Sequence, residues 1–215
     1  MSKQTSLMCA LAAAIVVMSG CTPAVYTVGG TIPSSNSSKG ATKAQFSLQG
    51  DSCDGLEVGL KGSFTYHDKS AIAYNPNLKG NGLQMTGPVL LVSDCSNPGS
   101  VEEDAFCHGV WQGESNPEIE YLLQNCPLLG GASNAPVKFF AGLYTSTNTR
   151  YPGDGLVLGC VQDNGQGRKA TFKDQAVILV PGDAYTFGGN GPYQGYINQG
   201  SVQGNVSTYT CPPPP

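Results

Sequence analysis

Two groups of side chains have residue types that could support serine-hydrolase chemistry. His67 and Asp68 are neighbours, and a His–Asp pair can activate a serine nucleophile. Successive residues of a β-strand point to opposite faces, so we expect these two not to act together. Ser115 stands in the sequence Gly-Glu-Ser-Asn-Pro, which lacks the closing glycine of a nucleophile elbow. We interpret Ser115 as an ordinary surface residue and predict no catalytic triad.

Four glutamates resemble glycosidase acids in type but not in position. Catalytic carboxylates of that kind converge across a cleft. Glu102 and Glu103 instead fall in a capping box, and Glu118 and Glu120 follow the helix-start sequence Asn-Pro. Acids in a first helical turn interact favourably with the helix dipole. We interpret all four as helix-start charges and predict no catalytic residue.

A possible calcium loop lies around Asp163-Asn164-Gly165, with Asp154 and Asp174 close by in the chain. Ca²⁺ takes oxygen ligands from loops of this composition. The spacing matches no EF-hand or repeat loop, and Asp-Asn-Gly is also a favoured turn in any β protein. We therefore predict no metal and no cofactor.

The N-terminus has the pattern of an export signal. Lys3 precedes an apolar run over residues 7–18, which at 12 residues is shorter than the roughly 20 needed to span a bilayer. The following residues, Val-Met-Ser-Gly-Cys, resemble a bacterial lipobox, which implies removal of residues 1–20 and acylation of Cys21. Thr22 in place of Asp implies, by the same resemblance, export to the outer membrane. The alternative is a secreted protein with an incidental cysteine at this position.

The segments that flank the predicted folded part have linker composition. Residues 21–42 are rich in Ser, Gly and Thr without clear periodicity, so we predict a flexible tether. Residues 212–215 are four prolines and predict a short polyproline II tail. The folded part is then a single domain over residues 43–211.

Six cysteines remain after Cys9 of the signal segment and Cys21 are set aside. An even number in an exported chain indicates disulfides, with 15 possible pairings for six cysteines. Zinc is the alternative, but no two cysteines stand at the C-x₂₋₄-C spacing and the two histidines are far apart. We favour a Cys107–Cys126 bond and leave open the pairing of the other four candidates, which are Cys53, Cys95, Cys160 and Cys211.

Composition indicates a β protein without a nucleic-acid partner. Charged residues make up 12% of the chain and 29 of its 215 residues are Gly, which disfavours exposed helices. The net charge of −4 lacks the basic footprint that binds phosphates. Polar and apolar residues alternate over residues 43–49 and 60–67, with Phe64 and Tyr66 pointing inward. Further strands are predicted over residues 83–92, 137–145, 156–162, 176–180 and 202–209. About eight short strands are typical of a sandwich or a barrel, and we expect an antiparallel β-sandwich.

One region departs from this pattern. Residues 94–135 hold seven acids, no Lys or Arg, the single Trp111 and three cysteines. We predict a disulfide-tied insertion with one or two short helices. Either Trp111 packs with nearby leucines in a small core of the insertion, or it anchors a partner protein on an acidic surface. The candidate interface residues are Glu102, Glu103, Trp111, Glu118 and Glu120.

Three motifs follow one another along the chain: Gly-Ser-Phe-Thr-Tyr-His-Asp over residues 62–68, Val-Gln-Asp-Asn-Gly over 161–165, and Gly-Ser-Val-Gln-Gly-Asn-Val over 200–206. Their order resembles that of the post-COAP type of small β-domain found in bacterial exported proteins. The resemblance covers about half of the mature chain and implies an accessory β-module without established catalysis. The gap between the first two motifs is about twice that of the family pattern, and the excess coincides with the acidic insertion.

Taken together, these features predict a noncatalytic, outer-membrane-anchored protein that serves as a structural or adaptor component of an envelope assembly. A secretion-system outer-membrane complex is one host of that kind. The alternative is a surface or periplasmic ligand-binding or adhesion module, with loops near Asp163 or over residues 188–195 binding glycan or peptide.

Overall fold

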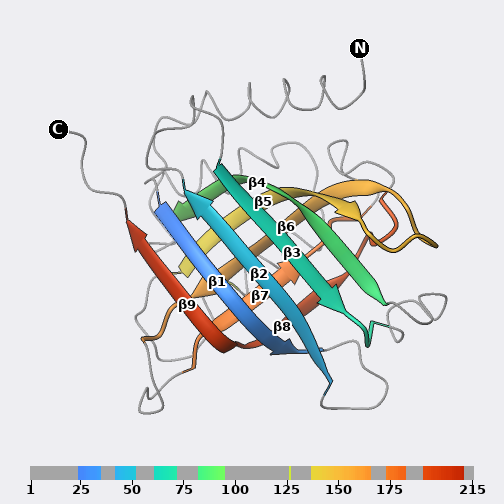
Figure 1. Cartoon of the computed structure of the whole chain (residues 1–215). Coiled ribbons are helices and arrows are strands. Elements are labelled where there is room, and N and C mark those ends of the chain that lie inside the picture. The colour runs from blue at the N-terminus through green and yellow to red at the C-terminus, as the bar shows by residue number, and fades with distance from the viewer. Residues whose placement is uncertain are drawn as a thin grey trace.

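The computed structural model describes residues 24–34, 42–51, 61–71, 82–94, 126, 137–165, 173–182 and 191–210. Within these ranges the chain forms nine strands, coloured in chain order in Figure 1. They are β1 Ala24–Pro33, β2 Lys43–Asp51, β3 Lys61–Asp68, β4 Leu83–Asp94, β5 Val137–Ser146, β6 Asp154–Gln162, β7 Gln175–Leu179, β8 Ile197–Ser201 and β9 Gln203–Thr210. All pairings between them are antiparallel, which confirms the predicted mainly β class.

A single sheet contains all nine strands, in the order β8-β7-β6-β5-β4-β3-β2-β1-β9. Val202 alone separates β8, which pairs with β7, from β9, which pairs with β1. The last part of the chain therefore joins the two edges, and the sheet is a nearly closed barrel in which β9, β1, β2 and β3 cross in front of β5, β6 and β7 (Figure 1). The predicted two-sheet sandwich is corrected to one curved sheet, because each strand from β1 to β8 pairs with its neighbours in sequence.

The up-and-down order gives the barrel two ends. The register places the start of β1 beside the ends of β2 and β9, and we call this end the N-terminal rim; its strand-end residues are Ala24, Asp51, Lys61, Asp94, Val137 and Thr210. At the opposite end β1 finishes at Pro33 and β3 at Asp68. This second end is called the tyrosine rim, since Tyr193 and Tyr196 lie buried there.

Alternating burial fills the barrel with side chains. In β2 exposed and buried residues alternate without exception, and Ala44, Phe46 and Leu48 point inward as predicted. Phe64 and Tyr66 of β3 are also buried, again as predicted. Across the interior, Phe64 packs against Phe140 with ring centroids 5.9 Å apart. Burial of this kind contributes about 1.5–3 kcal/mol for each large apolar side chain, so the interior is the main source of stability.

Residues 24–33 correct the predicted tether. The structure places them in β1, which is hydrogen-bonded to β2 on one side and to β9 on the other. Tyr26, Val28 and Ile32 alternate inward and are almost fully buried. The pair Gly29-Gly30 interrupts this alternation in the sequence, which is why the strand was missed. Only the rest of the 21–42 segment lies outside a strand or outside the described residues.

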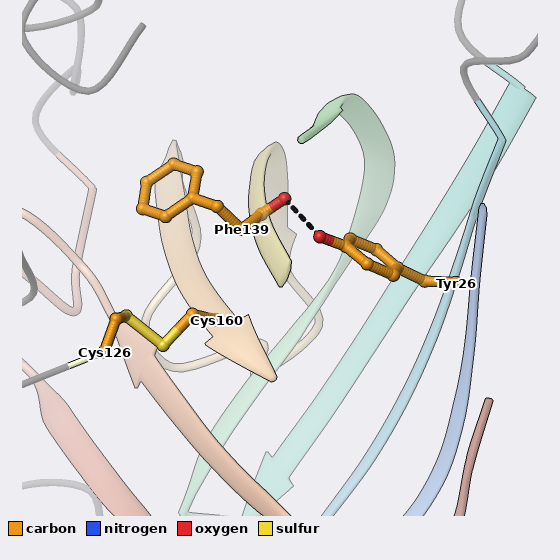
Figure 2. The surroundings of a disulfide bond; sticks show 4 residues. All are labelled: Tyr26, Cys126, Phe139 and Cys160. Carbon is orange, nitrogen blue, oxygen red and sulfur yellow. Dashed lines mark hydrogen bonds between the residues drawn. A yellow bond between two sulfur atoms is a disulfide. The ribbon is translucent and has the colours of Figure 1, made fainter. Parts of the chain in front are cut away.

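β5, β6 and β7 are buried on both faces, unlike β2. Cys160 of β6 is fully buried and forms a disulfide with Cys126 (Figure 2). The favoured Cys107–Cys126 bond was therefore wrong, because the bond ties the insertion to the barrel wall instead of closing a loop within it. The predicted helices of the insertion lie outside the described residues.

Candidate functional site

A buried carboxylate organises the tyrosine rim. Asp68, at the end of β3, has no exposed surface. Its Oδ2 accepts hydrogen bonds from the Ser34 hydroxyl at 2.6 Å and from the Tyr196 hydroxyl at 2.7 Å. Its Oδ1 accepts the main-chain N–H of Ser70 at 2.8 Å. Burial of an ionised group without such donors would be very costly, so these three bonds are what allow a charge at this place.

The direction of the hydrogen bonds continues from Asp68 to two further side chains. Tyr196 uses its only hydroxyl proton on Asp68, so Tyr66 must be the donor in the 2.6 Å contact between the two phenol oxygens. Asn198 in turn donates from its Nδ2 to the Tyr66 oxygen at 2.7 Å. The chain Asn198, Tyr66, Tyr196, Asp68 therefore has a single polarity, and each member is paired.

Burial decides the protonation of both phenols. Burial raises the pKa of Tyr66 far above its ordinary value, and the negative charge of Asp68 adds to the rise, while the hydrogen bonds that Tyr66 makes with Tyr196 and Asn198 oppose it. Burial also raises the pKa of Tyr196, with further contributions from Tyr66 and Asp68. Both hydroxyls are thus protonated at neutral pH and act as donors, which is what the geometry requires.

A second polar cluster lies beside the first. The Tyr193 hydroxyl is 2.7 Å from the Ser146 hydroxyl, and the Tyr193 ring stacks on Tyr144 at a centroid distance of 5.7 Å. Asn148 donates from its main chain to Ser146 and from its Nδ2 to the main-chain oxygen of Gly82. These bonds attach the β5–β6 turn to the start of β4. Hydrogen bonds between polar groups therefore link neighbouring strand ends at the tyrosine rim.

The outer surface of β2, β3 and β4 carries an open hollow of about 400 Å³, which we call the outer groove. Small side chains, Ser47 and Thr65, lie between longer ones, among them His67 and Gln84, whose Nε2 atoms are 3.1 Å apart. Its lining residues are Gln45, Phe46, Ser47, Thr65, Tyr66, His67, Gln84, Met85, Thr86 and Thr147. None of them is Asp, Glu, Lys or Arg, so the groove offers hydroxyl and amide groups to a neutral polar ligand.

The structure separates the residues that sequence analysis weighed for catalysis. His67 lies on the outer face and Asp68 inside the barrel, so the two side chains point to opposite faces of the sheet, as expected. Asp154 stands at the start of β6, whereas Asp163 and Asp174 stand at its other end. The three acids therefore do not converge on one ion.

Asp163-Asn164-Gly165 forms a turn after the end of β6. Gly165 has φ of 92° and donates its N–H to Asp163 at 3.0 Å, and the Asn164 N–H donates to Asp174 at 2.8 Å. Partial burial raises the pKa of Asp174, the charge of Asp163 adds to the rise, and the bond from Asn164 opposes it. In the part of the chain that the structure describes, no three His, Cys, Asp or Glu side chains gather as a metal site would need.

Most of the other predicted site residues lie outside the described residues. These are Cys21, the predicted lipidation site, the interface candidates Glu102, Glu103, Trp111, Glu118 and Glu120, and the cysteines Cys53, Cys95, Cys107 and Cys211. Cys126 and Cys160 are the two candidates that the structure brings together. With that pair assigned, four cysteines and three possible pairings remain.

Sequence reasoning missed the buried Asp68 cluster. The signal was present, because the inward alternation of Phe64 and Tyr66 continues to residue 68. Tyr196, Tyr193 and Asn198 carried no comparable signal, since they follow a Gly-rich stretch. Lys138, which is 1% exposed within β5, was missed for the same kind of reason: a charged residue in a strand normally indicates an exposed face.

Comparison with protein-family models, with curated proteins and with solved structures gives no match for this chain. Among the described residues there is no helix with the length and apolar character required to cross a membrane.

Proposed function

We propose that this protein is a noncatalytic, lipid-anchored component of a bacterial cell-envelope assembly, with the barrel as a rigid adaptor. The anchor is the acyl-bearing Cys21 in the outer membrane. The acid-rich 94–135 segment, with Glu102, Glu103, Trp111, Glu118 and Glu120, is the surface offered to a protein partner. A secretion-system outer-membrane complex is one assembly that such a component serves, and the resemblance to post-COAP modules is consistent with an accessory role.

The observation that carries this proposal is the position of β1. It begins at Ala24, only three residues after Cys21, and it is paired on both sides inside the sheet. A lipid at Cys21 would therefore be attached to the barrel wall itself and not to a mobile tail. A rigid body held at a membrane suits positioning of other proteins. The Asp68 carboxylate accepts three hydrogen bonds from within the chain, which supports a structural role for this residue.

The test is extraction of the tagged full-length protein from its native membrane in mild detergent, followed by sizing and mass spectrometry of accompanying proteins. We expect partners in constant ratio, lost when Glu102, Glu103, Glu118 and Glu120 are all changed to Lys. The matched control changes Asp51 and Asp154, two exposed acids on the barrel, to Lys and should retain the partners. A lone monomer from the native membrane would contradict the adaptor function.

A second candidate function, ligand binding, is favoured by the uncharged outer groove. Its hydroxyl and amide lining suits a neutral saccharide, which presents the complementary hydroxyls. Ligand-detected NMR with neutral oligosaccharides should then show binding that is lost when Thr65 on the groove floor is replaced by Trp. Thr27→Trp, an exposed threonine of β1 away from the groove lining, is the control.

A further inference from the structure

We infer that the N-terminal rim of the barrel faces the lipid surface and that the tyrosine rim points away from it. This orientation rests on the proposed lipidation of Cys21. It assigns a membrane-facing surface to the strand ends of the N-terminal rim, among them Asp51 of β2 and Val137 of β5.

The chain between Cys21 and the barrel is short. A fully extended chain advances about 3.3–3.6 Å per residue, so Cys21 lies within about 11 Å of Ala24. Ala24 pairs with Thr210 of β9, and Val25 pairs with Asp51 of β2. The lipid is therefore held close to the ends of three neighbouring strands.

The height of the barrel exceeds the reach of this linker. β2 has nine residues, which gives a strand of about 30 Å, and barrel strands tilt by about 35–45°, so the two rims lie about 20–25 Å apart. An inverted barrel would need a linker that covers this height. Three residues are too few, whereas a 20-residue tether of the kind predicted from composition would have permitted every orientation.

The connection from β4 to β5 lies at the same rim as the start of β1. In an up-and-down barrel alternate connections meet at the same rim, so β4 ends and β5 begins at the N-terminal rim, at Asp94 and Val137. The acid-rich segment therefore leaves and re-enters the barrel on the membrane side. A protein that binds this segment would be one that lies at the membrane surface, which narrows the kind of partner that the adaptor holds.

The experiment measures the distance of each rim from the bilayer in lipidated protein reconstituted into phosphatidylcholine and phosphatidylethanolamine vesicles. A fluorescent amino acid replaces Asp51 at the N-terminal rim or Lys69 at the tyrosine rim, both exposed, and the acceptor dye is on the lipid headgroups. We expect several-fold higher energy transfer from position 51 than from position 69. Equal transfer, as for a barrel lying on its side, or the reverse order would overturn the inference.

Two controls separate this inference from the proposed lipidation. The mass of the N-terminal peptide reports directly whether Cys21 carries acyl chains, and the Cys21→Ser variant should give no transfer from either position. Insertion of about 20 Gly and Ser residues after Thr22 lengthens the linker to a mean span of about 25 Å and should remove the difference between the two positions. An acylated protein without a rim difference would contradict the orientation alone.

Discussion

The hydroxyl oxygens of Tyr66 and Tyr196 lie 2.6 Å apart inside the barrel, although 130 residues separate them in the chain. Tyr66 belongs to β3, and Tyr196 ends the turn that precedes β8, so this contact ties two walls of the barrel together. Asp68 gives the contact its direction by taking the Tyr196 proton. We therefore expect this pair of hydroxyls to contribute to the free energy of unfolding.

High pH should destabilise the fold through these two phenols. Their pKa values are raised in the folded state above the ordinary value of 10.0, so the stability that they contribute is fully present below pH 10 and is lost as the pH rises above it. We expect the free energy of unfolding to fall by up to about 1.4 kcal/mol per pH unit for each tyrosine. Urea denaturation between pH 8 and about pH 11.5 gives this slope.

The Tyr66→Phe variant is the control for that slope, because it removes one of the two buried phenols. It should be less stable at all pH values but should lose less stability per pH unit above pH 10. An unchanged slope would mean that Tyr66 ionises in the folded protein as readily as in the unfolded chain.

Asp68→Asn should destabilise the protein by about 2–4 kcal/mol, because an amide cannot accept from all three donors. If its nitrogen takes the Oδ2 position it faces the Ser34 and Tyr196 hydroxyls, and if it takes the Oδ1 position it faces the Ser70 N–H. Asp154→Asn is the matched control, since Asp154 is exposed and accepts one bond from Thr145. It should change stability by no more than about 0.5 kcal/mol. Equal effects of the two substitutions in thermal unfolding would argue against the buried network.

Gly30→Ala should weaken the closure of the barrel, whereas Gly29→Ala should not. A Cβ at residue 30 would lie 2.6 Å from the main-chain oxygen of Gln203 and 2.9 Å from the Cα of Gly204, where β1 and β9 pair. A Cβ at residue 29 meets nothing within 4 Å. We expect a loss of about 1–3 kcal/mol for Gly30→Ala only, with faster amide hydrogen exchange in β9. Similar stability of both variants would show that the β1–β9 pairing is looser than described.

Removal of the Cys126–Cys160 bond should cost about 3–4 kcal/mol, because it closes a loop with a sequence separation of 34. The double variant Cys126→Ala and Cys160→Ala tests this cost by urea denaturation. A peptide map of the unreduced protein should contain the 126–160 link. A map that joins Cys126 to Cys107 would contradict the structure.

A hydrogen bond across the interior shows why distant partners escaped sequence analysis. Tyr26 of β1 donates its hydroxyl to the main-chain oxygen of Phe139 in β5 at 2.9 Å, while the Phe139 ring points away from Tyr26 (Figure 2). The acceptor is a main-chain oxygen 113 residues away in the sequence, and no pattern of side chains predicts such a contact. Tyr196, which completes the Asp68 cluster, is equally remote from its partners.

Alternation with a period of two is a local property of an extended chain, so the strand class, most strand positions and the inward side chains of β2 and β3 could be predicted from the sequence. The same period, followed one step further, would also have placed Asp68 inside. Three features were decided by the tertiary structure alone: the closure of one sheet in place of a sandwich, the Cys126–Cys160 pairing, and the incorporation of Ala24–Pro33 as a strand. Each depends on which distant segments become neighbours, and β1 in particular is a strand because β2 and β9 supply hydrogen-bond partners on both of its sides.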